Sequence, residues 1–368
     1  MAIVRVPVTV ILMASSCVAQ SDYLAFAGGY GPGIYGLRFH AATGRLTRIG
    51  LAAKTASPSF LAMHPNGRFL YAANEAGNND DSLSSFAVDR KSGKLTALNH
   101  VSARGSSPCD LAFDKTGRFL AVANYASGSV AVFPVLPDGR LGEAVGFDQH
   151  HGHSVNPDRQ KGPYAHSVLF SPDNRYLLST DLGLDKIFVY RFDASTGAIS
   201  QGPEPVSVPA GSGPRHMAFH PNGQMLYVIN EMASTVAAFH YNPVSGQLDP
   251  SQIVSTLPED YAEPNIAAEI AVNAAGSVLY ASNRGLDSIA LFSIDPQRLL
   301  IAPMERVSSL GKTPRYFTFD PTGEYLIVTN QDSDNIVVFR IHPHTGELRP
   351  AGPIVKDIPK PSCIVFVR

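Results

Sequence analysis

The sequence predicts an all-β protein, a seven-bladed β-propeller in which each blade has four antiparallel strands. A phrase of two short apolar strands around a polar turn recurs six times, and a second turn recurs in step with it. Glycine (31 residues) and proline (28 residues) are abundant in the 368-residue chain. Only 16% of the residues are charged, against about 25% in average soluble proteins. Long charged helices are therefore not expected, whereas short strands joined by tight turns are.

The first repeated phrase is an apolar strand, a glycine turn and a second strand that often starts with Leu-Tyr and ends at Asn. Its first copy runs from Leu61 to Asn74. Asn or Asp before Gly supplies the positive-φ positions that tight hairpins need. Neighbouring copies lie 47 to 57 residues apart, which is typical of propeller blades. Their turns are centred on Gly67, Gly117, Asn174, Gly223, Gly276 and Gly323.

The second repeated turn predicts how the ring closes. It occurs seven times, once more than the first phrase, at 43–44, 92–93, 138–139, 196–197, 245–246, 345–346 and, in degenerate form, 296–298. The missing first strand lies at the far end of the chain, where residues 361–366 parallel residues 58–63. The C-terminal strand is therefore expected to complete the blade that residues 23–48 begin. Such pairing leaves no open sheet edge between the termini.

The N-terminus reads as a separate segment. A basic residue, Arg5, precedes an apolar run at 6–13, and small residues follow up to Ala19. This order is typical of a secretory signal peptide, so we expect a leader at 1–19 and one propeller domain at 20–368. An ordinary first strand and a weak lipoprotein acceptor site are the alternatives. The protein is expected to be exported to the periplasm or the extracellular space, or to be cytoplasmic if the leader is not cleaved.

Composition and missing motifs exclude several function classes. The net charge of −2 and a pI near 6.6 give no indication of a nucleic-acid partner. No apolar run approaches the roughly 20 residues of a membrane span. A Gly-rich phosphate loop, a GxSxG elbow and an HExxH helix are all missing from the sequence. The two cysteines beyond the leader, Cys109 and Cys363, fall in units that are not neighbours and are expected to remain buried thiols.

A histidine cluster lies in the longest insertion between repeats. His150, His151 and His153 precede the next strand phrase, but no carboxylate or cysteine with ligand spacing accompanies them. We interpret the segment as a polar loop or lid. No metal and no cofactor is expected to be required. The sequence does not indicate an oligomeric state.

Ionisable side chains gather on one predicted rim. In an antiparallel blade the start of the first strand and the end of the second lie on one face. A polar cluster over an apolar scaffold near the axis is the usual pattern of a binding site. We therefore predict a catalytic set and a supporting set at these positions. The catalytic set is His166, Arg215, Glu231 and Arg284, and the supporting set is His216, Glu269 and Asp181.

Each of these residue types also has a structural interpretation. His216 is equally compatible with a structural histidine of the core whose ring nitrogens are hydrogen-bonded. Arg284 and Glu231 are also placed to pair with each other, and Arg315 suits a surface or inter-blade ion pair better than a ligand contact. The functional interpretation depends on four ionisable residues meeting on one rim. The Asn that ends most second strands is expected to cap its own hairpin, at Asn74, Asn124, Asn230, Asn283 and Asn330.

Several motifs keep register with the repeats. They are Gly-Pro-Arg-His at 213–216, Ala-Glu-Ile at 268–270, Ser-Asn-Arg-Gly at 282–285 and His-Ser-Val-Asn-Pro-Asp-Arg-Gln at 153–160. In combination, and over residues 23–367, they resemble the seven-bladed propeller lactonase family. Its members include the propeller type of 6-phosphogluconolactonase and the fungal carboxymuconate cyclase. The turn near Arg298 lacks the glycine that is usual in the family.

The resemblance implies a site of one histidine, two arginines and one glutamate, at His166, Arg215, Arg284 and Glu231. The expected activity is hydrolysis of a sugar-type lactone, with a histidine or glutamate taking the proton of water and arginines holding the developing oxyanion. The substrate would be a small-molecule lactone or carboxylate. Two alternatives stay open: a lactonising enzyme of the carboxymuconate cyclase type, and an exported propeller that binds protein or carbohydrate without catalysis.

Overall fold

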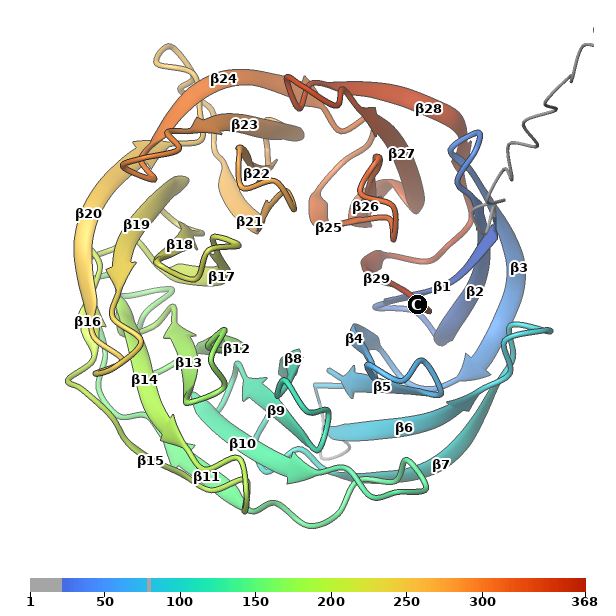
Figure 1. The fold of residues 1–368 in the computed structure, drawn as a ribbon, viewed down its shortest axis with the longest axis horizontal. Coiled ribbons are helices and arrows are strands. Elements are labelled where there is room, and N and C mark those ends of the chain that lie inside the picture. The colour runs from blue at the N-terminus through green and yellow to red at the C-terminus, as the bar shows by residue number, and fades with distance from the viewer. Residues whose placement is uncertain (1–21, 78–80) are drawn as a thin grey trace, which may run out of the picture.

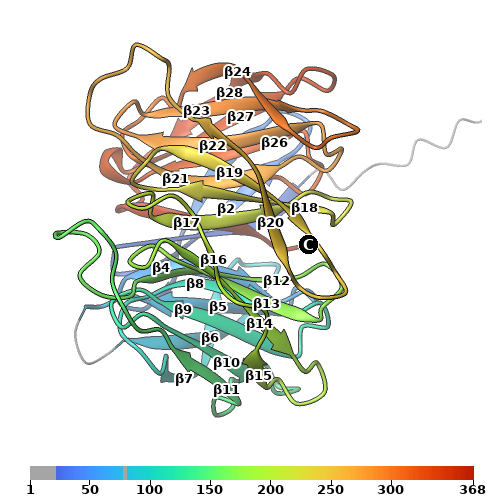
Figure 2. The same cartoon turned by 90° about the vertical axis from the view of Figure 1, so that its left-hand side faces the viewer.

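The computed structural model describes residues 22–77 and 81–368, so the predicted leader at 1–19 lies outside the described residues. Seven antiparallel sheets surround a central axis (Figure 1), which confirms the predicted propeller. We number the sheets as blades 1 to 7 along the chain. Figure 2 views the ring from its edge and shows the outer strands on the wall. Within the described residues no helix is long and apolar enough to cross a membrane.

Each blade begins with a strand beside the axis and extends outward. Blade 1 contains β29 (Pro361–Phe366), β1 (Asp22–Gly29), β2 (Gly33–His40) and β3 (Arg45–Lys54), and blade 2 contains β4 (Pro58–Met63), β5 (Phe69–Asn74), β6 (Ser82–Val88) and β7 (Leu95–Ser102). Blade 3 contains β8 (Pro108–Phe113), β9 (Phe119–Asn124), β10 (Ser129–Pro134) and β11 (Gly146–Gln149). Blade 4 contains β12 (Ala165–Phe170), β13 (Tyr176–Asp181), β14 (Lys186–Phe192), β15 (Ile199–Gln201) and β16 (Val206–Ser207). In blade 4 the outer strand is split, because β15 and β16 both pair with β14.

The remaining three blades are regular. Blade 5 contains β17 (Pro214–Phe219), β18 (Met225–Asn230), β19 (Thr235–Tyr241) and β20 (Leu248–Ser255). Blade 6 contains β21 (Ile266–Val272), β22 (Val278–Arg284), β23 (Ser288–Ile294) and β24 (Ile301–Ser308). Blade 7 contains β25 (Pro314–Phe319), β26 (Tyr325–Asn330), a 3₁₀ turn at Gln331–Ser333, β27 (Asn335–Ile341) and β28 (Leu348–Val355).

The two ends of the described chain share blade 1, as predicted. β29 pairs antiparallel with β1, and Cys363 lies opposite Gly28. Cys109 belongs to blade 3, so the two cysteines stand in blades that are not adjacent. Both are buried free thiols.

The apolar core lies between blades. Each of the seven buried clusters among the described residues joins one pair of neighbouring blades. The tyrosine of the Leu-Tyr phrase has a specific role there. Its buried hydroxyl donates across the blade interface to a carbonyl oxygen in the turn before the outermost strand of the neighbouring blade. Tyr71, Tyr227 and Tyr280 bond the carbonyl oxygens of Gly139, Leu299 and Gly346 at 2.7, 2.7 and 2.8 Å.

The degenerate turn of blade 6 keeps the geometry of the others. Leu299 has φ of 58°, in the left-handed region that Gly occupies elsewhere. Its N–H donates to the Asp295 carbonyl oxygen at 2.9 Å, as that of Gly93 does to Asp89. The leucine side chain is buried in the cluster between blades 5 and 6. The apolar burial of the Leu299 side chain therefore offsets the cost of its left-handed backbone.

The repeated Asn caps its hairpin, as predicted. The side chain of Asn230 donates to the Thr235 hydroxyl at 3.0 Å, which ties the end of β18 to the start of β19. Asn283 and Ser288 make the same contact at 3.3 Å in blade 6.

Every innermost strand carries a β-bulge near its start, at the level of the predicted rim. The ladder skips one residue of each innermost strand against its neighbour, except in blade 6, where it skips two residues of β21 against one of β22. A bulge leaves its extra residue unpaired and re-aims the side chain, and bulges are common next to active sites. We call the skipped residues the bulge ring. It consists of Ser59, Cys109, His166, Arg215, Ala268 with Glu269, Arg315 and Ser362.

Candidate active site at the centre of the ring

The four residues of the predicted catalytic set meet at one carboxylate. Glu231 Oε2 accepts hydrogen bonds from Arg284 Nη2 at 2.6 Å and from Arg215 Nε at 3.1 Å. The Nε2 atom of His166 lies 4.0 Å from the same oxygen. These residues come from three consecutive blades, 4, 5 and 6. We call them the Glu231 cluster.

Local backbone structure explains why these side chains converge. His166 and Arg215 are bulge-ring residues of β12 and β17, and Glu231 follows the capping Asn at the end of β18. Arg284 is the last residue of β22. Both arginines also donate to backbone carbonyls of β21, at 2.6 Å to Ala268 and 2.8 Å to Ala267. The blade 5–6 interface therefore fixes both guanidinium groups.

Burial gives the cluster unusual electrostatics. Burial alone would raise the pKa of the Glu231 carboxyl, but the charges of Arg284 and Arg215 outweigh it and hold that pKa well below its usual range. Burial lowers the pKa of Arg284 to about 10, which leaves the guanidinium charged at neutral pH. Arg284 Nε is buried and has no acceptor among the described residues. The cluster therefore holds a permanent anion and a donor with no acceptor.

His166 is neutral in this setting. Burial, followed by the charges of Arg215 and His216, holds its pKa well below the ordinary value. The Cys109 thiol lies beside it and donates to the His166 carbonyl oxygen at 3.3 Å. Burial raises the pKa of that thiol well above its usual value, so the sulfur stays protonated. The neutral imidazole is thus the cluster's available proton acceptor.

A third arginine reaches the cluster, and sequence reasoning missed it. Arg159 Nη2 donates to Glu231 Oε1 at 2.6 Å, and its side chain is 40% exposed. It belongs to the insertion before β12, which is tied down by bonds from Ser154 to Asp185 and from Gln160 to the Leu182 carbonyl. Arg159 lies within the motif at 153–160, which was the one sequence feature that could have pointed to it, but the motif alone did not identify this arginine as a site residue. The insertion lies outside the repeat register and so had no predicted position.

Two members of the supporting set form a layer next to the cluster. His216 Nδ1 lies 3.0 Å from Glu269 Oε2, and its ring centre lies 5.4 Å from that of His166. The Nε2 atom of His216 is buried with no partner among the described residues, so this histidine is only half satisfied. Asp110, on β8, is fully buried nearby, and burial raises its pKa to about 6 against the opposing charge of His216.

The third supporting residue, Asp181, is engaged elsewhere. Its carboxylate pairs with His150 Nδ1 at 2.6 Å and accepts the backbone N–H groups of Tyr164 and Leu184. His150 is therefore a buried structural residue, contrary to the polar-loop interpretation, whereas His151 and His153 are exposed. Among the described residues, no group of three or more His, Cys, Asp or Glu is arranged to hold a metal ion.

The prediction for Arg315 was wrong. It forms no surface or inter-blade ion pair within residues 22–77 and 81–368, and instead donates from Nη2 to the Tyr30 hydroxyl at 2.9 Å. Tyr30 in turn donates to Glu75 Oε2 at 2.7 Å. The partner was unexpected because Tyr30 follows β1, at the opposite end of the chain.

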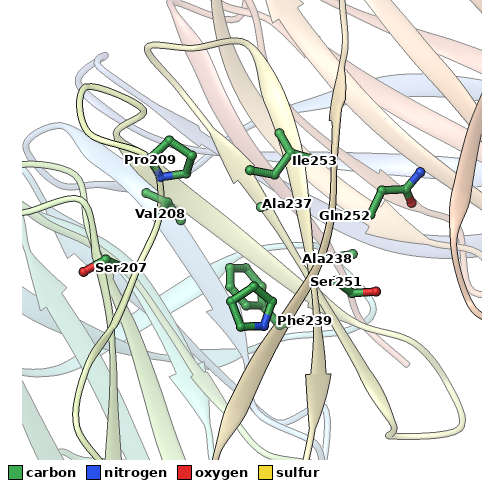
Figure 3. A pocket seen from close by; sticks show the side chains of 10 residues that line it. Ser207, Val208, Pro209, Ala237, Ala238, Phe239, Ser251, Gln252 and Ile253 are labelled. Carbon is green, nitrogen blue, oxygen red and sulfur yellow. The ribbon is translucent and has the colours of Figure 1, made fainter.

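A small cavity borders the cluster. It has a volume of about 10 Å³, roughly enough for one water molecule. Larger grooves lie elsewhere, such as one of about 540 Å³ on the outer wall between 207–209 and strands β19 and β20 (Figure 3). That groove has no ionisable side chain among its lining residues, whereas the small cavity is lined by Arg215 of the cluster and by other ionisable side chains. The lining of the small cavity includes Tyr30, Glu75, Cys109, Arg215, His216 and Arg315.

Comparisons with known proteins agree with this architecture. The family model described as lactonase, 7-bladed beta-propeller, matches residues 22–366. A 6-phosphogluconolactonase of Bacillus subtilis is 35% identical over 95% of this chain and 99% of its own length, and one of Formosa agariphila is 34% identical over 87% and 91%. The structure of a periplasmic gluconolactonase of Pseudomonas aeruginosa superimposes with a TM-score of 0.87 at 33% identity, over 95% of this chain and 99% of that one. The chain therefore belongs to the seven-bladed β-propeller lactonase family of enzymes.

Proposed function

We propose that this protein hydrolyses a sugar-type lactone, as a 6-phosphogluconolactonase or gluconolactonase does, at the Glu231 cluster. The observation that carries the proposal is the meeting of His166, Arg215 and Arg284 around one buried carboxylate. A binding scaffold has no physical reason to hold these charges together beside the axis. The names of the relatives support the substrate class.

The neutral imidazole of His166 would act as general base. It takes a proton from a water that attacks the lactone carbonyl carbon, which forms a tetrahedral intermediate. The ring C–O bond then breaks, and the imidazolium returns the proton to the leaving alkoxide, giving the open hydroxy acid. Its lowered pKa makes the imidazolium a stronger acid for that second step. Glu231 is the poorer base, because the neighbouring arginines keep it ionised.

The arginines would stabilise the oxyanion. Glu231 uses one nitrogen of Arg215 and one of Arg284, so each guanidinium keeps N–H groups for substrate. The buried Nε of Arg284 has no acceptor among the described residues, and an oxyanion would supply one. Donors fixed before the reaction avoid reorganisation as charge develops, and one such donor is typically worth about 10²–10³ in rate.

A substrate panel tests the proposal. Purified protein is assayed with gluconolactone, its 6-phosphate and carboxymuconate, and acid release is followed by pH-stat. We expect turnover of at least one lactone, and a loss of about 10²-fold or more in Arg215→Ala and Glu231→Ala variants whose circular dichroism matches that of the wild type. Failure to hydrolyse either lactone, or turnover of carboxymuconate alone, would contradict the proposal.

We also propose that the protein is exported. The order of basic, apolar and small residues up to Ala19 supports export, and the Pseudomonas aeruginosa relative is named as periplasmic. Cell fractionation with N-terminal sequencing is the test. Mature protein beginning near residue 20 is expected, and material that retains Met1 would contradict export by cleavage.

A further inference from the structure

One arginine beside the axis has no carboxylate partner. Arg159, Arg215 and Arg284 all pair with Glu231. Arg315 makes a single hydrogen bond, to Tyr30, and no carboxylate oxygen of the described residues lies within 4.0 Å of its nitrogens. Burial alone would lower the pKa of the Arg315 guanidinium, but Tyr30, Glu75 and Glu231 outweigh it and raise that pKa, so the group stays charged and its remaining N–H groups can bind an anion.

Neighbouring blades hold this guanidinium in place. Its central carbon lies 5.3 Å from the centre of the Tyr30 ring, within cation–π range, while Nη2 bonds the phenol oxygen. Burial raises the pKa of the Tyr30 phenol, so its proton remains available for Glu75. The phenol oxygen thus accepts from Arg315 and donates to Glu75. The arginine is oriented before any ligand arrives, which lowers the entropic cost of binding.

Arg315 borders the same cavity as the catalytic arginine. Arg215, His216, Tyr30 and Glu75 line that cavity with it. Arg215 and Arg315 are equivalent members of the bulge ring, in blades 5 and 7. A ligand whose ester carbonyl lies at Arg215 can therefore extend along the ring toward Arg315. The cavity holds only about 10 Å³, so side chains that line it must shift before one ligand can contact both arginines.

We propose that Arg315, oriented by Tyr30, is a second anion-binding subsite that recognises a phosphoryl or carboxylate group of the substrate remote from the lactone ester. This subsite rests on the proposed function of the Glu231 cluster and determines substrate preference. A planar guanidinium binds such groups in bidentate geometry, which suits it to this task.

The test compares two lactones that differ by one phosphate. Arg315→Gln is assayed with gluconolactone and with its 6-phosphate, beside Arg340→Gln, which removes an exposed arginine of the same blade. We expect Arg315→Gln to lower kcat/KM for the phosphate ester about 10- to 100-fold, mainly through KM, and that for the neutral lactone less than about twofold. Arg315→Lys should restore part of the preference, because it keeps the charge without the planar fork.

The outcomes separate this subsite from the proposed function. Equal losses for both lactones, or no change for either, would overturn the subsite and leave lactone hydrolysis standing. If the wild type hydrolyses neither lactone, calorimetric titration with inorganic phosphate decides the matter without activity. Binding that Arg315→Gln abolishes and Arg340→Gln keeps would support the subsite, and binding that is unchanged or absent in the wild type would overturn it.

Discussion

At the scale of single residues, charge placement inside the ring is the dominant feature. Glu231 pairs with three arginines, and loss of its carboxylate would leave two buried guanidinium groups, those of Arg215 and Arg284, without an anionic partner. The repeat register predicted that His166, Arg215, Glu231 and Arg284 lie on one rim, because the start of each first strand and the end of each second strand share one face. It did not predict which atoms pair, since pairing depends on rotamers and on a loop outside the register.

The first residue-scale prediction concerns Glu231→Gln. The unfolding free energy should fall by about 3–5 kcal/mol at pH 7, because partly or fully buried arginines lose their anion. The folded pKa of Glu231 is depressed, so its stabilisation is present above the unfolded value of 4.5 and is lost as pH falls below it. The difference from wild type should therefore shrink in acid, as measured by urea unfolding between pH 3 and pH 8.

The matched control is Glu324→Gln, which removes an exposed carboxylate 4.0 Å from Arg340. It should cost less than about 1 kcal/mol at any pH. Equal effects of the two substitutions would show that the buried carboxylate does not stabilise the arginines.

The second residue-scale prediction concerns Asp110. Its folded pKa is raised by burial to about 6 from 3.8, so the ionised carboxylate destabilises the fold as pH rises from about 4 through 6. An amide keeps an oxygen for the Val168 N–H and removes the charge. Asp110→Asn should raise the midpoint of thermal unfolding at pH 8, with a gain on the order of 1–3 kcal/mol. The control Asp158→Asn, at an exposed carboxylate, should leave the midpoint unchanged. If Asp110→Asn stabilised the protein as much at pH 4 as at pH 8, this explanation would be contradicted.

At the scale of elements, the sequence predicted blades more reliably than loops and bulges. Strand phrases recur with a fixed pattern, so each copy supports the others, and the Leu-Tyr start marks a bond between blades. The repeat register grouped most bulge-ring residues at one rim position, but a bulge shifts the register by one residue without a composition signal, so the bulges themselves were not predicted. The insertion that carries Arg159 has no second copy with which to align, so its path over Glu231 could not be predicted.

The element-scale prediction concerns Leu299 in the turn that lacks glycine. Two effects oppose each other, since a left-handed φ costs a leucine about 1–2 kcal/mol, whereas removing a buried leucine side chain costs about 2–5 kcal/mol. The lost burial is the larger free-energy cost, so Leu299→Gly should be destabilising. Leu299→Ala loses the burial and keeps the strain. The expected order of stability is Leu, then Gly, then Ala, and denaturant unfolding that places Ala above Gly would show the turn to be unstrained.

At the scale of the whole molecule, ring closure gives each of the seven sheets a neighbour on both sides against which it buries its apolar faces. Each cluster is shared between two blades, so no blade buries its apolar faces alone. The closing strand β29 belongs to clusters on both sides, against blades 2 and 7. The sequence predicted this closure because residues 361–366 repeat the phrase at 58–63 and had no partner within their own unit.

Deletion of residues 361–368 tests the closure. The truncated chain should lose cooperative thermal unfolding, because β1 becomes an open edge and two blade interfaces lose their innermost strand. A synthetic peptide with the sequence of residues 357–368 should restore part of the transition by pairing with β1. A truncated chain that unfolds at the wild-type temperature would show that closure by β29 does not stabilise the ring.

Steady-state hydrolysis by His166→Gln tests the central claim most directly, that the Glu231 cluster carries out lactone hydrolysis. The substitution removes the proton acceptor from the cluster, and His153→Gln removes an exposed histidine of the insertion as the control. With the lactone that the wild type turns over best, kcat should fall about 10²–10⁴-fold in His166→Gln and stay unchanged in His153→Gln. Folded His166→Gln protein that retains wild-type kcat would contradict the assignment of the active site.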